Sequence, residues 1–131
     1  MPHPSVIHFG DTPNGAGGQS LPFSPALRAG DFVFVSGQVA MNERGEIEPG
    51  GIEAQTHQTF ANIKKALALA DCALEDVVKV TVWLDDTRDF WSFNRVYVGY
   101  FPNKPPVRSC VQASMMVDCK VEIEVMAYKP L

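Results

Sequence analysis

The chain has 131 residues and a formal net charge of −4, with 46% hydrophobic and 20% charged residues. A chain of this length fits one domain that buries its own core, so folding requires no disulfide or metal. The composition excludes a mainly disordered protein. The acidic balance, with a pI near 5.2, argues against a nucleic-acid binder, because such proteins need a basic surface to neutralise phosphates.

The sequence also argues against a membrane or secreted protein. No apolar run approaches the roughly 20 residues that span a bilayer, and the first residues lack the basic region and apolar stretch of a secretory signal. Cys72, Cys110 and Cys119 form no CxxC pair and show no metal-ligand spacing with the histidines. We therefore expect a cytoplasmic protein with reduced thiols, no metal and no membrane partner.

The chain is expected to begin with a flexible N-terminal arm, residues 1–20, followed by a single domain, residues 21–131. Residues 10–25 are rich in glycine and proline, which is typical of a loop. Residues 31–39 carry β-branched and aromatic side chains on both faces and predict a central strand. A glycine- and proline-containing turn region follows at 41–51.

Two helices and three more strands are predicted beyond this turn. Residues 77–84, 107–113 and 121–128 alternate as strands do, with Val78, Val80, Val82 and Leu84 on one face and a hairpin joining the last two strands. Thr87 is expected to cap the second helix. One apolar stripe per helix is predicted: Ile52, Thr56, Phe60, Ile63, Leu67 and Ala70 in the first, and Phe90, Phe93, Tyr97 and Tyr100 in the second.

This order of elements predicts an α+β fold, a mixed sheet with both helices packed on one face, because crossover connections are right-handed. The valine-rich faces of the last strands should then pack under the helices. The opposite face would carry Arg108, Cys110, Glu122 and Glu124 and is too mixed for a core. Such a face is usually covered by another subunit, which predicts a homo-oligomer.

The candidate site residues lie on these last strands. Arg108 follows two prolines, and its planar guanidinium suits a carboxylate ligand; the alternative is a structural ion pair with Glu122 or Glu124. Glu122, expected on the face of Arg108, could position a water or move a proton, or could simply pair with a basic residue. Spacing does not separate Glu122 from Glu124. Cys110 is a nucleophile or a packing thiol.

A small tripeptide ends the central strand. Gly37, between Ser36 and Gln38, would let another group approach the backbone closely, or would mark a β-bulge. Ser36 has no general base within sequence reach, so a Ser-His-Asp hydrolase is poorly supported.

Several segments in this order resemble the YjgF/Rid family of reactive intermediate deaminases: PFSPALRAGDFVFVSGQV, DFWSFNRVYVGYF, PPVRSCVQAS and VEIEVMAYK. The resemblance covers about Leu21 to Lys129. It implies the chorismate-mutase-like YjgF fold, assembled as a homotrimer with sites between subunits. It also implies hydrolysis of enamine or imine carboxylates such as 2-aminoacrylate to 2-keto acids and ammonia, without a cofactor.

Carried over by motif, Arg108 would bind the substrate carboxylate and Glu122 would hold the attacking water. Ser36, Gly37, Asn94 and Cys110 match positions that line the family's pocket. The family often has tyrosine where this chain has Phe23, which leaves the identity of the substrate open. Alternatives are a dedicated deaminase for a larger enamine such as 2-aminomuconate, an endoribonuclease or translation-inhibitor role, and a non-catalytic small-molecule binding module.

Overall fold

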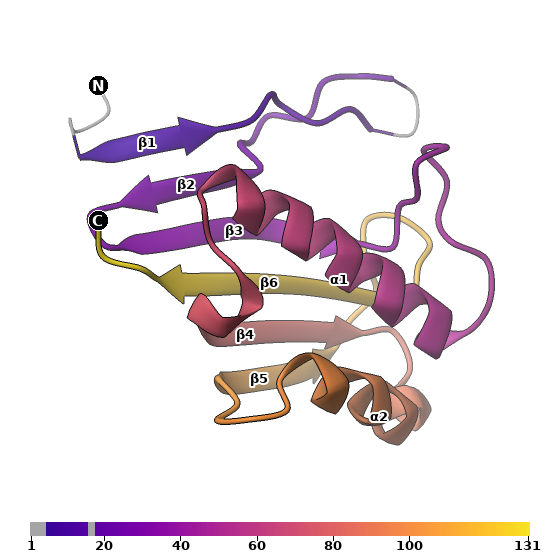
Figure 1. Cartoon of the computed structure of the whole chain (residues 1–131). Coiled ribbons are helices and arrows are strands. Elements are labelled where there is room, and N and C mark those ends of the chain that lie inside the picture. Colours follow the sequence, from indigo (N-terminus) through magenta and orange to yellow (C-terminus); the bar gives the residue numbers. More distant parts are fainter. Residues whose placement is uncertain (1–4, 16–17) are drawn as a thin grey trace.

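The computed structural model describes residues 5–15 and 18–131. They form one six-stranded mixed sheet in the order β1-β2-β3-β6-β4-β5, and both α-helices lie on one of its faces (Figure 1). Strands β4 and β5 run parallel, and the other neighbours are antiparallel. This arrangement confirms the predicted α+β class. The elements are β1 (Val6–Phe9), β2 (Ala26–Ala29), β3 (Phe32–Val39), α1 (Ile52–Leu69), η1 (Leu74–Asp76), β4 (Val77–Leu84), η2 (Thr87–Asp89), α2 (Phe90–Tyr100), β5 (Val107–Gln112) and β6 (Val121–Tyr128).

The N-terminal segment contributes a strand that the sequence analysis did not predict. Strand β1 pairs antiparallel with β2, so that Val6 lies opposite Ala29 and Phe9 opposite Ala26. Four residues are too few to show a clear alternation in the sequence, and the strand is defined by its pairing with β2. Residues 1–4 and 16–17 of the predicted arm lie outside the described residues.

The predicted hairpin between the last two strands is wrong. Strand β5 pairs only with β4 among the described strands, in parallel, and β6 runs between β3 and β4. The cause is the right-handed β4-α2-β5 crossover, which places β5 at the sheet edge beside β4. The chain then returns across the end of the sheet to fill the space between β3 and β4 (Figure 1).

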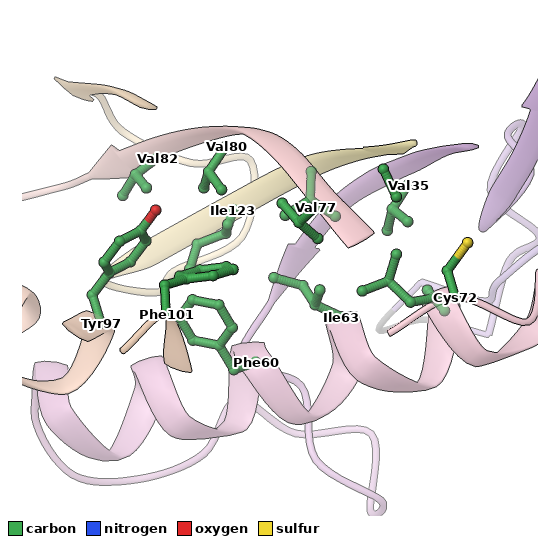
Figure 2. Close-up of a cluster of buried hydrophobic side chains, with 14 of the residues drawn as sticks. Val35, Phe60, Ile63, Cys72, Val77, Val80, Val82, Tyr97, Phe101 and Ile123 are labelled. Carbon is green, nitrogen blue, oxygen red and sulfur yellow. The ribbon is translucent and has the colours of Figure 1, made fainter. Parts of the chain in front are cut away.

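The helices cover the core as their patterns predict (Figure 2). All six residues of the predicted α1 stripe are buried, and Phe60, Ile63 and Leu67 are completely buried. Helix α2 contributes Phe93 and Tyr97 to the same cluster. Burial of such side chains stabilises the fold by about 1.5–3 kcal/mol each. Helix α1 therefore lies across β3 and β6, with α2 beside it.

Two local predictions need correction. A register shift between Val77 and Lys79 turns Val77 into the core and leaves Val78 40% exposed, so Val78 does not share the face of Val80. The capping group before α2 is Asp86 and not Thr87. The Asp86 carboxylate accepts a hydrogen bond from the backbone N–H of Arg88 at 2.9 Å, and its hydrogen bonds with Arg88 lower its pKa to about 2.

Candidate functional site

Arg108 projects from the helix-covered face of the sheet. It lies opposite Val80 in the β4–β5 pairing, and Val80 is completely buried beneath the helices. The valines that were expected to face the core, Val107 and Val111, are instead 67% and 50% exposed on the other face. The predicted facing of this strand is therefore wrong, because an edge strand need not direct its most apolar side chains toward the core.

The surroundings of Arg108 are aromatic and come from α2. Its Nη1 donates a hydrogen bond to Oδ1 of Asn94 at 2.8 Å. Its guanidinium carbon lies 4.7 Å from the ring centroid of Tyr97, 5.7 Å from that of Phe90 and 5.8 Å from that of Phe93. Rings at this range attract a cation through their faces. One end of α2 therefore holds the guanidinium at the sheet edge.

Cys110 lies two residues along the same strand and faces the same side, opposite Val82. It is half-buried, and burial raises the pKa of its thiol, with Arg108 acting in the opposite direction. The thiol lines a pocket of about 280 Å³ with Phe90 and Trp91. A thiol with a raised pKa is mostly protonated at neutral pH, which favours a pocket-lining role over a nucleophilic one.

Glu122 occupies a different environment, on β6. It is half-buried, and desolvation, with a smaller contribution from Glu124, raises the pKa of its carboxyl group. Its carboxylate lies directly against Gly37, where any added Cβ would collide with Oε2 of Glu122. A larger residue at position 37 would therefore require the end of the Glu122 side chain to move. Gly37 gives the close approach that the sequence suggested, and the approaching group is Glu122.

The tripeptide around Gly37 is also a β-bulge. The β3–β6 register shifts between Val35 and Gln38, so the strand carries an extra residue here. Ser36 is tied down, since its hydroxyl donates to the carbonyl oxygen of Ser24 at 2.6 Å. This bond connects the bulge to the loop that carries Phe23. Phe23 is 40% exposed and lines a pocket of about 340 Å³ together with Gly37.

The structure does not bring the predicted site residues together within one chain. Glu122 pairs with Trp83, and its neighbour Ile123 points into the core, so Glu122 projects from the face opposite Arg108. The prediction that these two residues share a face is wrong. The alternative of an ion pair between Arg108 and Glu122 or Glu124 fails as well, because among the described residues no ion pair includes Arg108.

Two groups therefore stand apart. The first, which we call the arginine group, contains Arg108, Asn94 and Cys110. The second, the glutamate group, contains Glu122, Gly37, Ser36 and Phe23. A cavity of about 730 Å³ near the C-terminal end of α2 includes neither Arg108 nor Glu122 in its lining.

The sequence analysis missed Tyr97 as a neighbour of Arg108. Tyr97 had been assigned to the core stripe of α2, and it is indeed buried. The available signal was its spacing of three residues from Asn94, which puts both side chains on one face of the helix. That face also receives Arg108.

In residues 5–15 and 18–131, no group of three or more His, Cys, Asp or Glu side chains is arranged to hold a metal ion. No helix of the same ranges combines the length and apolar character that crossing a bilayer requires. All three cysteines are free thiols.

Comparisons with known proteins agree with this fold. A family model described as Endoribonuclease L-PSP matches residues 17–129. The RutC family protein PH0854 of Pyrococcus horikoshii is 44% identical over 110 residues, covering 82% of this chain and 87% of that protein. The Mus musculus 2-iminobutanoate/2-iminopropanoate deaminase is 35% identical over 108 residues, covering 81% of this chain and 80% of that protein.

A solved structure is similar over nearly the whole chain. The crystal structure of E. coli TdcF with bound serine matches with a TM-score of 0.82 at 30% identity, covering 94% of this chain and 98% of that one. The sequence match and the structural match extend over the same fold, including both helices and the sheet. The chain therefore belongs to the YjgF/RidA family.

Proposed function

We propose that the protein hydrolyses enamine and imine carboxylates of the 2-aminoacrylate type to 2-keto acids and ammonia. The observation that carries this proposal is the state of Arg108. Its guanidinium is fixed by Asn94 and by aromatic rings, and it has no carboxylate partner among the described residues. An arginine held in this way offers its remaining N–H donors to a carboxylate ligand. A relative with 35% identity is a deaminase of imino acids, which supports this substrate class.

The reaction needs little more than binding and orientation. The enamine gains a proton at its terminal carbon, loses one from nitrogen and so becomes the imine. Water then adds across the C=N bond to give a carbinolamine. The carbinolamine loses its hydroxyl proton, its nitrogen gains a proton and leaves as ammonia, and the carbonyl forms. Arg108 binds the carboxylate and fixes the position of the electrophilic carbon. Glu122 accepts a proton from the water and returns it to the leaving nitrogen, and its raised pKa brings it closer to the range that suits a general base.

The separation of Arg108 and Glu122 supports a site between subunits. Because the two residues project from opposite faces of one sheet, one chain cannot present both to the same small ligand. In a closed homotrimer the arginine group of one copy can meet the glutamate group of the next. The exposed side chains Phe34, Val107 and Val111 on the face away from the helices would be covered by such an assembly. We also propose a cytoplasmic location, which agrees with the free thiols.

The direct test is a coupled assay. A pyridoxal-phosphate serine or threonine dehydratase generates the enamine, and release of ammonia and keto acid is followed with and without the protein. We expect faster release with the protein. If release is not accelerated while the same preparation cleaves RNA, the endoribonuclease alternative replaces this proposal, although the charge of −4 argues against it.

Subunit mixing tests the location of the site. Arg108→Lys and Glu122→Gln are each expected to be nearly inactive. Co-expressed or refolded together in equal amounts, they should recover about a quarter of the wild-type activity, since random assembly places an intact arginine group beside an intact glutamate group at about one interface in four. Absence of recovery in confirmed mixed oligomers, or a monomer in sedimentation, would contradict a site between subunits.

A second candidate substrate is favoured by Phe23. Its ring is 40% exposed in a pocket of about 340 Å³, without the hydroxyl of a tyrosine. This environment suits a larger, less polar enamine such as 2-aminomuconate. Comparing kcat/KM on short and long enamines distinguishes the two. Binding of 2-keto acids without turnover on any enamine would support the non-catalytic binding module.

A further inference from the structure

We propose that Tyr97 is a positioning residue for Arg108, and that the face of its ring determines how the guanidinium is presented to a ligand. The inference rests on the proposed role of Arg108 as the carboxylate anchor. Tyr97 belongs to the core of α2, and its position beneath Arg108 connects that core to the arginine group.

Of the three rings around Arg108, that of Tyr97 lies nearest to the guanidinium. The guanidinium carbon lies 4.7 Å from the Tyr97 centroid, about 1 Å nearer than from Phe90 or Phe93. Within roughly 6 Å of a ring centroid a cation is attracted by the ring, and the attraction strengthens as water is excluded. Tyr97 is only 7% exposed. Its ring therefore provides the closest of the three surfaces and, like that of the completely buried Phe93, one from which water is largely excluded.

The ring itself is held rigidly in the core. It packs against Phe60 at 5.9 Å, Phe93 at 5.5 Å and Phe101 at 5.0 Å between centroids. Figure 2 shows its side chain reaching from the α2 side of the cluster toward the sheet near Val82. A ring enclosed in this way cannot follow the guanidinium if the guanidinium moves. Tyr97 therefore acts as a fixed surface for Arg108.

Asn94 and Tyr97 restrain the Arg108 guanidinium in different directions. Asn94 accepts one hydrogen bond from Nη1, which fixes the guanidinium within its plane. The Tyr97 ring restrains the group from the side of the core. Arginine has five N–H donors, so enough remain for the two parallel bonds that grip a carboxylate. The grip depends on the angle of the plane, and Tyr97 sets that angle.

The hydroxyl of Tyr97 is buried, and its oxygen forms no hydrogen bond of good geometry with the described residues. Burial raises the pKa of this hydroxyl, and the charge of Arg108 and its hydrogen-bonding interaction with the hydroxyl oppose the rise. The hydroxyl therefore stays protonated at neutral pH. Substitution by phenylalanine keeps the ring face and removes the hydroxyl, so it separates the effect of the ring on Arg108 from that of the hydroxyl.

The test compares three variants by NMR and by binding. Tyr97→Leu removes the ring, Tyr97→Phe keeps it, and Tyr100→Leu is the matched control. Tyr100 lies one turn further along α2, where its ring stacks on Phe60 at 4.1 Å, away from Arg108. The readouts are rotation about the Nε–Cζ bond of Arg108, from its Nε–Hε signal without ligand, and the Kd of L-serine against L-serinamide.

We expect Tyr97→Leu to speed the rotation and to weaken serine binding by about 5- to 30-fold, with less effect on serinamide, which lacks the carboxylate. Tyr97→Phe should restore both readouts to near the wild-type values. Tyr100→Leu should lower thermal stability without changing the Arg108 signal. In the Arg108→Lys background, Tyr97→Leu should cost little further, because the ring then has no guanidinium to orient.

Three results would overturn the inference: an unchanged Arg108 signal in Tyr97→Leu, a Tyr97→Phe variant that behaves like Tyr97→Leu, or an equal change in Tyr100→Leu. The proposed function fails in a different way. If the wild type lacks deaminase activity and serine binding while the Arg108 signal responds only to loss of the Tyr97 ring, Tyr97 still positions Arg108 and the chemistry assigned to Arg108 is wrong.

Discussion

The arginine group and the glutamate group differ in how their surroundings act on the charged side chain. Arg108 has a hydrogen-bond partner in Asn94 and lies against aromatic rings, which hold a permanent positive charge in one place. Glu122 has no cationic partner among the described residues and lies against the backbone of Gly37, where desolvation raises its pKa. In the proposed mechanism, the fixed guanidinium binds the substrate carboxylate and the carboxyl group with the raised pKa exchanges a proton.

The largest effect is expected at the proton-exchanging group. Glu122→Gln keeps the size of the side chain but removes the base, so turnover in the coupled assay should fall by about 100- to 10,000-fold. Subunit assembly should be unaffected in light scattering. A variant that retains turnover within a few fold of the wild type would show that Glu122 does not handle the proton.

The same residue makes a prediction about pH. If Glu122 acts as the base in its ionised form, turnover should fall as the pH drops through its raised pKa, which lies above the ordinary value of glutamate. The free energy of unfolding should depend on pH in the opposite direction to turnover. A group with a raised pKa in the folded state contributes stability that is complete below its ordinary pKa and is lost as the pH rises through the folded value.

Glu122→Gln should therefore be at least as stable as the wild type at about pH 8, and this advantage should disappear at about pH 4. Thermal unfolding at the two pH values measures the difference. A variant that is less stable than the wild type at high pH would show that the carboxylate has a stabilising partner, in conflict with its raised pKa.

The next effect is expected at the fixed charge. Arg108→Lys keeps the charge but loses the planar, two-pronged donor, which should cost about 2–4 kcal/mol, or roughly 30- to 1,000-fold in kcat/KM. Arg95→Lys on helix α2 is the control, because Arg95 is exposed and its Nη2 lies 3.9 Å from the carboxylate of Glu53. An equal loss of kcat/KM in Arg95→Lys, or unfolding of Arg108→Lys alone, would contradict a role of Arg108 in substrate binding and indicate a structural role.

A smaller effect tests the contact within the glutamate group. Gly37→Ala places a Cβ against the Glu122 carboxylate, and the carboxylate must move to make room. A displacement of about 1 Å can cost up to about 100-fold in rate, so kcat should fall with little change in the melting temperature. Wild-type kcat in this variant would show that the position of Glu122 is not critical. Gly51→Ala is the control, because Gly51 lies outside the site, has an ordinary φ of −88° and leaves open space for an added Cβ.

The smallest effect is expected at Phe23. If a hydroxyl here helps to hold a small substrate or water, Phe23→Tyr should raise turnover of 2-aminoacrylate by about 2- to 13-fold, since one neutral hydrogen bond contributes about 0.5–1.5 kcal/mol. If the site suits a larger enamine, turnover of that substrate should fall by a similar factor. Unchanged rates on both substrates would remove Phe23 from the site.

The sequence predicted the positions of the helices and strands better than it predicted which side chains face the core. The stripe of α1 was correct at every position because a long helix repeats its pattern over several turns and packs on one side. The facing of β5 was wrong because Val107 and Val111 suggested that their side faces the core, whereas Arg108 and Cys110 lie on the helix-covered side. A shift of facing by one residue moves every side chain of a strand to the other face.

The candidate site shows the same division. The motifs that resemble the YjgF/Rid family identified Arg108, Asn94, Gly37 and Glu122, and the structure brings the first two together and the last two together. Spacing along the chain could not show that these are two separate groups. It also could not reveal Tyr97 as the surface beneath Arg108, because a tyrosine in an apolar stripe looks like any other core residue.

The sequence by itself determined both α-helices, the four longer strands, the bulge-forming glycine and the kinds of side chain available for chemistry, because these depend on patterns between near neighbours. The four-residue strands β1 and β2 are too short for such a pattern and were not predicted. The tertiary structure alone decided where β5 and β6 lie in the sheet. That placement follows from the handedness of the crossover through α2. Since it sets the face of each strand, it also turned Arg108 toward the helices and Glu122 away from them.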